Sequence, residues 1–328
     1  CIDALGSYGG KLVEVPYTSG VSSGALLDAG LTIGTTPDVR RKALRRLLQA
    51  KPLSRFIETH SPLSAIIAER AVASSEGIEH RFDGFWSSSL TDSTLFGKPD
   101  IEAVDLSHRL STVNQCFEVT TLPMIFDGDT GGQPEHFELN VRSMERLGIS
   151  AVIIEDKKGL KKNSLLGTAV DQVQEDPVVF GEKIQRGKKA LVTTDFMIIA
   201  RIESLILDQG LRPALDRART YVRAGADGIM IHSKDTTPRA VFKFAREFRK
   251  EFPKTPLVCV PTTYQTVFEG ELEANGFNIV IYANQLLRAS YPAMRRVADQ
   301  ILSEKRASGV GDYLASVDEI LDLIPGTR

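Results

Sequence analysis

The sequence predicts a (β/α)8 barrel of the TIM type, and three observations support this fold class. Eight short, nearly continuous apolar runs recur along the chain, segments with helical spacing separate them, and polar residues follow almost every run. Such runs are typical of strands that are buried on both faces of a parallel sheet. The runs span residues 55–58, 83–88, 123–129, 151–156, 197–203, 228–233, 256–262 and 278–284.

The segments between the runs combine apolar residues at helical spacing with a charged face. The clearest of them are 63–74, 134–148, 214–225 and 238–252, and several end at a Gly or Asn, which is a normal helix stop. A doubly wound open sheet is the alternative. The count of eight runs favours the closed barrel, as does the absence of a Gly-rich phosphate turn after the first run.

The composition excludes several classes of function. The 328 residues are 42% hydrophobic and 25% charged, with a net charge of -2, which argues against binding to nucleic acid or to an anionic membrane surface. No apolar run approaches the roughly 20 residues that cross a bilayer. The three cysteines, Cys1, Cys116 and Cys259, form neither a zinc pattern nor a disulfide framework, so we expect a cytoplasmic protein.

Polar residues gather at the carboxyl end of nearly every run. A barrel brings these ends together on one face, where its active site lies. Because buried charge is costly without a purpose, packing alone explains such a convergence poorly, and we expect an active site here. The residues are Glu58, Ser87, Ser88, Ser89, Asp127, Asp129, Glu155, Asp156, Lys157, Arg201, Glu203, His232, Ser233, Lys234, Thr262, Thr263 and Asn284.

Three of these residues predict a metal site. Asp127, Asp129 and Glu155 come from adjacent runs and would face one another. Carboxylates this close repel unless a cation or a shared proton intervenes. Without a matching Cys or His cluster, a hard-oxygen site for Mg²⁺ is the simplest solution.

The following runs predict a binding site for an anion. Arg201 and His232 end the next two runs, and a guanidinium beside Mg²⁺ is suited to hold a phosphoryl or carboxylate group. The small residues Ser88, Ser89 and Leu90 follow Trp86, and their N–H groups are placed to bind a carboxylate or enolate oxygen. An ordinary tight turn is the alternative there.

The stretch "EDKKGLKKNS", residues 155–164, places acids, lysines and amide groups around one glycine. On composition alone it is typical of a solvated charged loop. Its position directly after the apolar run "AVII" makes a second interpretation worth testing, in which the loop covers the predicted active site.

Taken together, these residues resemble the phosphoenolpyruvate mutase branch of the phosphoenolpyruvate mutase/isocitrate lyase superfamily. The resemblance covers roughly residues 52–300, and its most diagnostic piece is "EDK…K-x-N-S". The matching motifs, in the order the family keeps, are "FIETHSPLSA", "GFWSSSL", "DGDTG", "EDKKGLKKNSL", "IIARIESL", "AGADGIMIHSK", "VPTTY" and "ANQLLRAS".

The resemblance implies a Mg²⁺-dependent barrel enzyme that interconverts phosphoenolpyruvate and phosphonopyruvate. It also implies a homodimer or homotetramer in which the C-terminal helices pack on a neighbouring subunit. By motif position, Asp127 would be the nearest metal ligand, and Asp129, Glu155 and Asp100 would support the metal through water. Trp86, Ser88, Ser89 and Leu90 would bind the pyruvate part, Arg201 and His232 the phosphoryl group, and Lys161, Asn163 and Ser164 would belong to a gating loop.

The gating loop separates relatives within the superfamily. Isocitrate and methylisocitrate lyases carry a catalytic cysteine there, which this chain lacks. Phosphonopyruvate hydrolases tend to replace the loop asparagine with threonine, so Asn163 favours the mutase and leaves the hydrolase as the alternative. We expect a loosely bonded phosphoryl group in transit, without a covalent intermediate on Asp100.

Two motifs depart from the family pattern. Gln285 stands where the family often has histidine, and "WSSS", residues 86–89, replaces the usual "W-G-S-G". The loss of both glycines limits the backbone conformations available after Trp86. This departure puts the proposed contacts of Ser88 and Ser89 in question.

The first fifty residues are predicted to lie outside the barrel domain. Residues 13–27, "VEVPYTSGVSSGALL", resemble the closing motif of the cytidylyltransferase fold, which some phosphonate-antibiotic producers fuse ahead of the mutase. We expect residues 1–27 to be the tail of such a domain, 28–50 a linker and 51–328 the mutase barrel. An unrelated extension that packs on the barrel is the alternative for 1–27.

Overall fold

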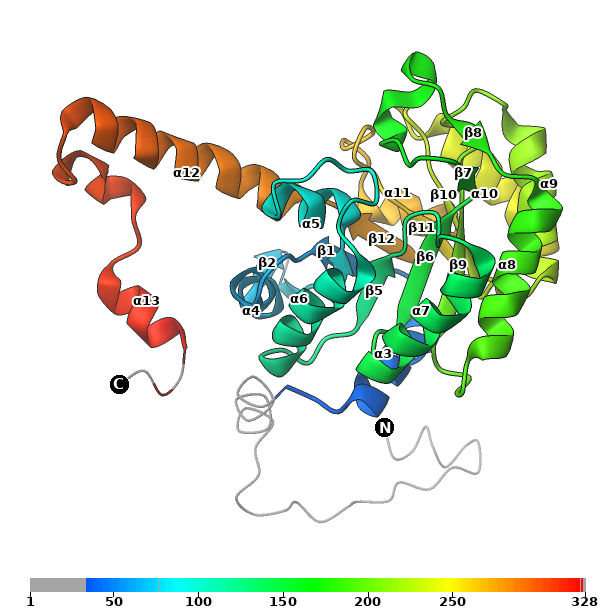
Figure 1. The fold of residues 1–328 in the computed structure, drawn as a ribbon, viewed down its shortest axis with the longest axis horizontal. Coiled ribbons are helices and arrows are strands. Elements are labelled where there is room, and N and C mark those ends of the chain that lie inside the picture. Colours follow the sequence, from blue (N-terminus) through cyan, green and yellow to red (C-terminus); the bar gives the residue numbers. More distant parts are fainter. Residues whose placement is uncertain (1–33, 76, 325, 327–328) are drawn as a thin grey trace, which may run out of the picture.

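The computed structural model describes residues 34–75, 77–324 and 326. The expected cytidylyltransferase tail, residues 1–27, lies outside them, and so does the first part of the expected linker. The described chain builds one barrel with helices around it and a helical arm at the C-terminus (Figure 1).

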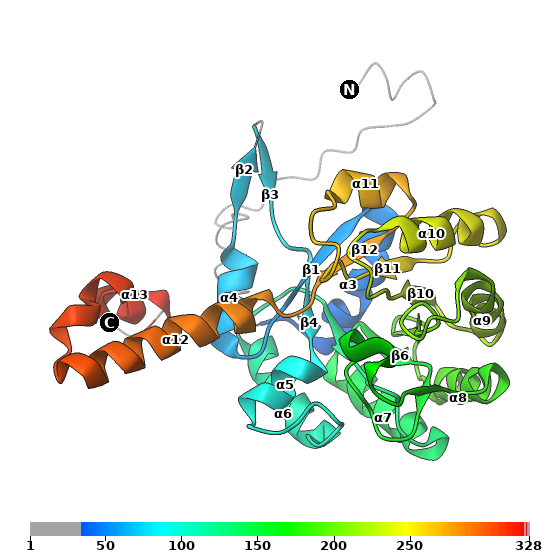
Figure 2. The same cartoon turned by 90° about the horizontal axis from the view of Figure 1, so that it is seen from above.

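Eight parallel strands close the barrel in the order β1-β12-β11-β10-β9-β6-β5-β4 (Figure 2). This confirms the predicted fold class. Each strand lies within or close to one predicted run, and most predicted polar ends fall just beyond the strand, in the loops. The strands are β1 (Ser54–Glu58), β4 (Gly84–Ser87), β5 (Met124–Asp127), β6 (Ala151–Glu155), β9 (Met197–Ile202), β10 (Gly228–Ile231), β11 (Leu257–Cys259) and β12 (Ile279–Tyr282).

Helices follow the strands and surround the barrel. The predicted helix at 63–74 ends at Arg70, because residues 73–75 pair instead with 78–80 in a short antiparallel hairpin of β2 (Ala73–Ser75) and β3 (Ile78–His80). The helices of the barrel are α4 (Pro62–Arg70), α5 (Ser89–Leu95), α6 (Leu106–Glu118), α7 (Pro134–Leu147), α8 (Pro177–Ala190), α9 (Leu211–Arg223), α10 (Arg239–Glu251) and α11 (Glu269–Ala274).

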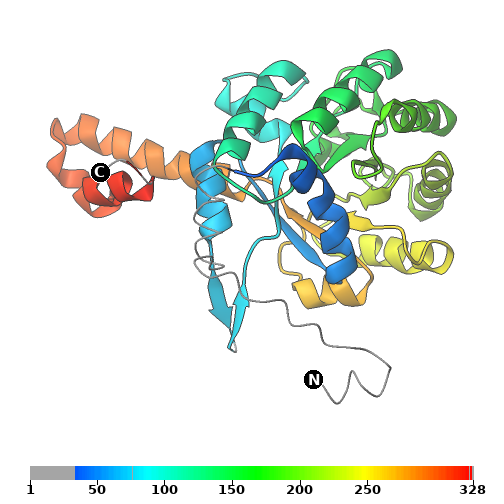
Figure 3. The ribbon, with the colours of Figure 1, turned by 90° about the horizontal axis from the view of Figure 1, so that it is seen from below.

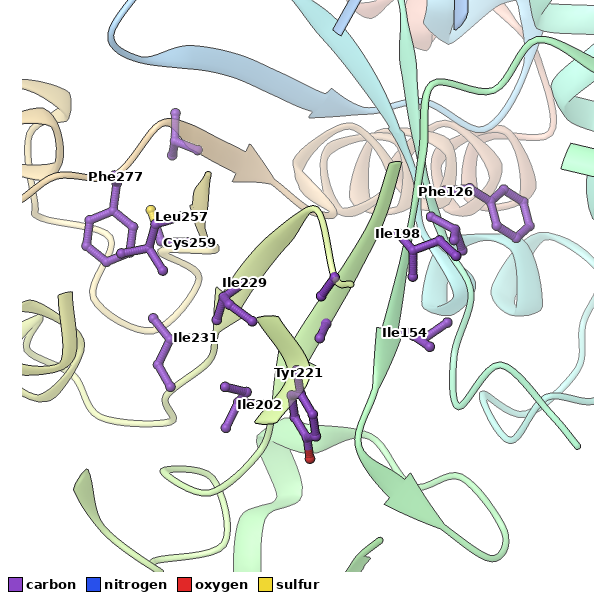
Figure 4. Close-up of a cluster of buried hydrophobic side chains, with 14 of the residues drawn as sticks. Phe126, Ile154, Ile198, Ile202, Tyr221, Ile229, Ile231, Leu257, Cys259 and Phe277 are labelled. Atoms are coloured by element: carbon purple, nitrogen blue, oxygen red, sulfur yellow. The ribbon is translucent and has the colours of Figure 1, made fainter. Parts of the chain in front are cut away.

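The apolar core has two parts, as alternation along the strands requires. Residues facing the barrel axis, such as Phe56, Ile125 and Ile199, fill its interior. Their neighbours face outward and pack against the helices, and Figure 4 shows this layer around Ile198 and Tyr221. Both parts are almost fully buried, so the strands are held rigidly and their ends keep fixed positions.

The lower end of the barrel is closed by α3 (Pro37–Ala50), seen in dark blue in Figure 3. Leu44 packs with the interior residues of the barrel. The buried Arg40 donates hydrogen bonds to Leu122 O at 2.7 Å, to Phe117 O at 3.0 Å and to Thr120 O, which satisfies carbonyls around the end of α6. Residues 37–50, more than half of the expected linker, are therefore packed against the barrel.

The C-terminal arm points away from the barrel (Figures 1 and 2). It consists of α12 (Gln285–Glu304), the 3-10 helix η2 (Ser308–Tyr313) and α13 (Val317–Leu323), and neither α12 nor α13 has a buried residue. The packing of this arm on a neighbouring subunit stays a prediction. No helix in the described parts of the chain has the length and apolar character needed to span a membrane.

A short hairpin interrupts the connection after β6. Strands β7 (Lys157–Lys158) and β8 (Val173–Gln174) pair antiparallel, and the residues between them, 159–172, form a segment that we call the lid. The lid contains the 3-10 helix η1 (Ser164–Ala169), which Asn163 caps through a hydrogen bond of 3.0 Å from Leu165 N to Oδ1.

Candidate active site

A cavity of about 540 Å³, opening included, lies at the carboxyl ends of the barrel strands and beneath the lid. It is lined by all the predicted catalytic and substrate-binding residues. Of the three predicted metal residues, Asp127 and Glu155 line it and Asp129 does not. The predicted residues that line it are Trp86, Ser88, Ser89, Leu90, Asp100, Asp127, Glu155, Lys161, Asn163, Ser164, Arg201 and His232.

Asp127 ends β5 and is held in one orientation. Its Oδ2 accepts hydrogen bonds from Ser89 Oγ at 2.7 Å and Ser89 N at 3.2 Å, and Oδ1 accepts one from Asp129 N at 3.2 Å. Burial alone would raise the pKa of Asp127, but the cations Lys161, Arg109 and Arg201 outweigh it and lower this pKa to about 2. Asp127 is therefore a fixed anion at neutral pH.

Asp129 lies behind Asp127 and bridges two cations. Its Oδ1 contacts the ammonium of Lys161, and its Oδ2 accepts a 3.1 Å bond from Nη1 of Arg109. The residue has a left-handed backbone, with φ 54°, a conformation that Asp tolerates better than most residues. This turn places the Asp129 side chain away from the cavity wall.

The lid contributes two residues that meet on Asp100. Lys161 Nζ donates to Asp100 Oδ1 at 2.7 Å, and Asn163 Nδ2 donates to Asp100 Oδ2 at 3.1 Å. Lys161 also contacts Asp129 Oδ1 and Ser89 Oγ, so its ammonium lies between two carboxylates and a hydroxyl group. Burial would lower the pKa of Lys161, but Asp129, Asp127 and other acids outweigh it and raise this pKa. The lid is thus closed over the site by charge.

Arg201 is the second-to-last residue of β9 and is fixed by Glu203. Its Nε donates to Glu203 Oε1 at 2.5 Å, and its Nη2 donates to Ser164 Oγ at 2.6 Å. Although burial opposes ionisation, the charge of Arg201 keeps the pKa of Glu203 well below its ordinary value. The guanidinium therefore faces the cavity in a defined orientation, suited to a planar or tetrahedral anion.

The hydrogen bonding of His232 defines its tautomer. Arg201 Nη2 lies 3.0 Å from Nδ1 of His232, and because a guanidinium can only donate, Nδ1 must be the acceptor. A neutral ring then carries its proton on Nε2. Burial and the charge of Arg201 lower the pKa of His232, which favours this neutral form. His232 can donate one hydrogen bond from Nε2.

The serines after Trp86 begin a helix. Ser88 is the N-cap of α5, and its backbone has φ -91°. Ser87, Ser88 and Ser89 all avoid positive φ, so the glycines of the usual family pattern are not needed for this backbone. Serine at these positions therefore does not prevent the backbone conformation that this segment adopts. In the first turn of α5, Ser89 N and Thr91 N already donate to Asp127 Oδ2 and to Ser88 Oγ, and Leu90 between them lines the cavity.

The acidic residues suit Mg²⁺ held largely through water. The donor set is carboxylate and hydroxyl oxygen, which Mg²⁺ prefers. Burial, opposed by Arg201 and Lys157, raises the pKa of Glu155 to about 7, so the surrounding cations do not fully compensate this carboxyl group. Within the described residues, no three Asp, Glu, His or Cys side chains are grouped to bind a metal directly. The ligand assignments for Asp127, Asp129 and Glu155 stay predictions.

Two buried cations at the site make contacts that the sequence did not predict. Arg109 of α6 donates to Asp92 Oδ2 at 2.7 Å, to Asp127 O at 2.7 Å and to Asp129 Oδ2, and its guanidinium lies over the ring of Phe126. Lys157, expected only to end a strand, donates three hydrogen bonds to the lid. For Arg109 the sequence offers only a basic residue on a helix, which is normally exposed.

Gln285, the departure from the family pattern, is the first residue of α12. Its Oε1 accepts a 3.0 Å hydrogen bond from the backbone N–H of Asn284, which lines the cavity. The glutamine therefore supports the loop after β12 through the backbone, a bond that needs only an acceptor on the side chain.

The fold and site define a class of protein: a (β/α)8-barrel enzyme whose active site combines acidic oxygens, an arginine, a neutral histidine and a lysine-bearing lid. Within that class, the chain belongs to the phosphoenolpyruvate phosphomutase family, whose model matches residues 44–302.

Similar proteins include mutases and a hydrolase. The chain is 33% identical to a phosphoenolpyruvate phosphomutase of Tetrahymena pyriformis, over 85% of this chain and 89% of that one. It is 34% identical to a phosphonopyruvate hydrolase of Variovorax sp. (strain Pal2), over 87% and 94%. Sequence identity alone therefore does not decide which reaction of the superfamily this chain catalyses.

Solved structures agree with the fold. A phosphoenolpyruvate phosphomutase from Streptomyces platensis subsp. rosaceus aligns with a TM-score of 0.78 and 36% identity, over 86% of this chain and 93% of that chain. A phosphonopyruvate hydrolase in complex with oxalate and Mg²⁺ aligns with a TM-score of 0.75 and 33% identity, over 87% and 94%.

Proposed function

We propose that the protein is a Mg²⁺-dependent phosphoenolpyruvate mutase, an isomerase that interconverts phosphoenolpyruvate and phosphonopyruvate and forms the C–P bond in phosphonate biosynthesis. The observation that carries this proposal is the closed lid. Lys161 and Asn163 both bind Asp100 above a cavity that also contains Arg201 and His232. Such a cover excludes water from a phosphoryl group in transit.

The residues of the site divide the work between the two halves of the substrate. Ser88, Ser89 and Leu90, at the start of α5, bind the carboxylate and enolate oxygens of pyruvate. Arg201 and His232 bind the phosphoryl oxygens, with charge from the guanidinium and a hydrogen bond from Nε2 of the histidine. Mg²⁺ held by Asp127, with support from Asp129 and Glu155, would supply further positive charge next to these oxygens.

The reaction is balanced within one molecule. The bond between phosphorus and the enol oxygen breaks, and a bond between phosphorus and C3 of the pyruvate enolate forms. Asp100 is hydrogen-bonded through Oδ1 to Lys161 and through Oδ2 to Asn163, so both of its oxygens are engaged by the closed lid. This supports a path without a phosphorylated aspartate, and trapping phosphate on Asp100 would contradict it.

Phosphonopyruvate hydrolysis is the second candidate, favoured by the 34% identity to a hydrolase. Asn163 argues for the mutase, because the hydrolases tend to carry threonine there. A lyase that uses a loop cysteine is a poor fit, because the lid sequence from 159 to 172 contains no cysteine.

The test is to incubate the protein with phosphonopyruvate and Mg²⁺ and to follow ³¹P NMR. The appearance of phosphoenolpyruvate supports the mutase. Inorganic phosphate, released together with pyruvate, would support the hydrolase and contradict our proposal.

The same proposal extends to assembly and location. We propose a cytoplasmic homodimer or homotetramer in which the C-terminal arm covers a second copy, since Tyr291, Met294 and Leu302 of α12 are each more than 60% exposed. Sedimentation velocity should report a dimer or larger, and a monomer at micromolar concentration would contradict it. An upstream cytidylyltransferase domain stays a prediction from residues 1–27.

A further inference from the structure

Lys157 has an unusual set of partners. Its side chain is buried, and Nζ donates to Lys162 O at 2.7 Å, to Ser164 Oγ at 2.9 Å and to Gln172 Oε1 at 2.9 Å. An ammonium group has three hydrogens. All three are therefore directed to the lid, near its beginning, at its middle and at its end.

Two carboxylates face the same ammonium without a hydrogen bond. Nζ of Lys157 lies 3.2 Å from Glu155 Oε1 and 3.8 Å from Glu203 Oε2. Both oxygens are buried and have no hydrogen-bond partner among the described residues. Buried acceptors without a hydrogen-bond partner are rare in native proteins, so each one needs a physical explanation.

We propose that Lys157 is a positioning residue that exchanges partners as the lid moves. In the closed state its three hydrogen bonds hold the lid over the cavity. When the lid lifts, the ammonium turns to Glu155 Oε1 and Glu203 Oε2, which are already within reach. This exchange avoids an unpaired buried charge, which is strongly unfavourable, so the lid can open without that penalty.

The exchange links the lid to the phosphoryl-binding residues. Ser164 Oγ accepts from both Lys157 and Arg201, so lifting the lid also removes a partner of Arg201. Glu203, which fixes Arg201, gains the ammonium of Lys157 at the same moment. Resting on the proposed function, we infer that Lys157 sets how often water reaches the phosphoryl group, and thus the ratio of isomerisation to hydrolysis.

The first test measures lid opening without turnover. Thermolysin cleaves before apolar residues, and Leu160, Leu165 and Leu166 of the lid are exposed. We expect Lys157→Met to raise the rate of cleavage within the lid at least about tenfold. Gln172→Met removes one acceptor of Lys157 and also the hydrogen bond from Gln172 Nε2 to Gly167 O, and we expect it to raise the rate about threefold. Lys158→Met is the matched control, because its side chain is 53% exposed on the same hairpin and should leave the rate unchanged.

Mass spectrometry of the fragments identifies the peptide bond at which thermolysin cleaves. Cleavage of Lys157→Met and Gln172→Met at the wild-type rate would overturn the inference. If Lys157→Met does not fold, Gln172→Met alone decides, and a rate within about twofold of the wild type overturns it.

The second test measures products from phosphonopyruvate by ³¹P NMR. We expect Lys157→Met to raise the ratio of inorganic phosphate to phosphoenolpyruvate about tenfold or more, and Lys158→Met to leave it unchanged. An unchanged ratio in a variant with faster lid cleavage would contradict the role in specificity. A wild-type protein that releases only phosphate would contradict the proposed function, while the cleavage test of the lid still holds.

Discussion

Arg201 donates a hydrogen bond of 3.0 Å from Nη2 to Nδ1 of His232, and this contact makes the histidine a neutral donor through Nε2. A protonated ring would place a second positive charge against the guanidinium, which explains why the pKa of His232 is lowered by burial and by Arg201. The contact between Arg201 and His232 is therefore expected to become less favourable as pH falls and the histidine is protonated.

The first prediction concerns stability below pH 6.5. The unfolded chain protonates histidine below a pKa of about 6.5, whereas the folded protein resists protonation of His232. The unfolded state then binds more protons, so the free energy of unfolding falls as pH drops, by up to about 1.4 kcal/mol per pH unit from this group. His232→Gln should reduce that slope between pH 6.5 and 5 in urea titrations.

The exposed His136→Gln serves as the control for this slope. Equal slopes for His232→Gln and the wild type would mean that His232 is protonated equally in the folded and unfolded states.

The second prediction concerns the lid residues that bind Asp100. Lys161→Ala and Asn163→Ala should each lower turnover by at least about 100-fold, because charge stabilisation and exclusion of water are lost together. Far-UV circular dichroism should stay unchanged. Lys158→Ala is the control for the loss of a lysine near the lid. Full activity in either lid variant would show that these residues do not cover the substrate.

The third prediction concerns Arg109. Its guanidinium is buried between Asp92 and Asp129, and replacement by methionine leaves two buried carboxylates without it. The free energy of unfolding should fall by about 3–5 kcal/mol. In contrast, Arg186→Met removes exposed ion pairs with Glu135 and Glu138 and should cost less than about 1 kcal/mol. Similar losses in both variants, measured by denaturant unfolding, would contradict the role of Arg109.

The fourth prediction concerns Mg²⁺. Oxalate with Mg²⁺ should raise the melting temperature, because a ligand at 100 times its Kd stabilises a protein by about 2.7 kcal/mol. Asp127→Asn should abolish the part that depends on Mg²⁺, since it removes a buried carboxylate whose lowered pKa keeps it charged at neutral pH. EDTA should reverse the increase in the wild type. A metal-dependent increase that persists in Asp127→Asn would assign the metal to other residues.

Much of the fold could be predicted because the barrel repeats one simple pattern. Ile198 and Ile199, for example, are apolar on both sides of β9, as a strand buried on both faces requires. The strand ends could be predicted for the same reason. The hairpin of β2 and β3 was not predicted, because "ASS" and "IEH" are mostly polar, and three residues are too few to show the periodicity of a strand.

The site was predicted where chemistry and position coincide. Asp127 ends β5, Arg201 lies near the end of β9 and His232 directly follows β10, so their convergence follows from topology. Asp100 lies in the loop between α5 and α6, far in sequence from any strand end, and only the family resemblance indicated that it belongs to the site. Arg109 and the hydrogen bonds of Lys157 depend on side chains that cross between elements, and no local pattern in the sequence records such contacts.

Trp86 is the one tryptophan in the sequence, and it lies buried at the end of β4 in the wall of the cavity. Indole emission responds to polarity and charge close to the ring. Tryptophan emission, excited selectively over the seven tyrosines, therefore comes only from the candidate active site. Substrate binding and lid movement can be followed in real time, on unlabelled protein, from this single natural reporter.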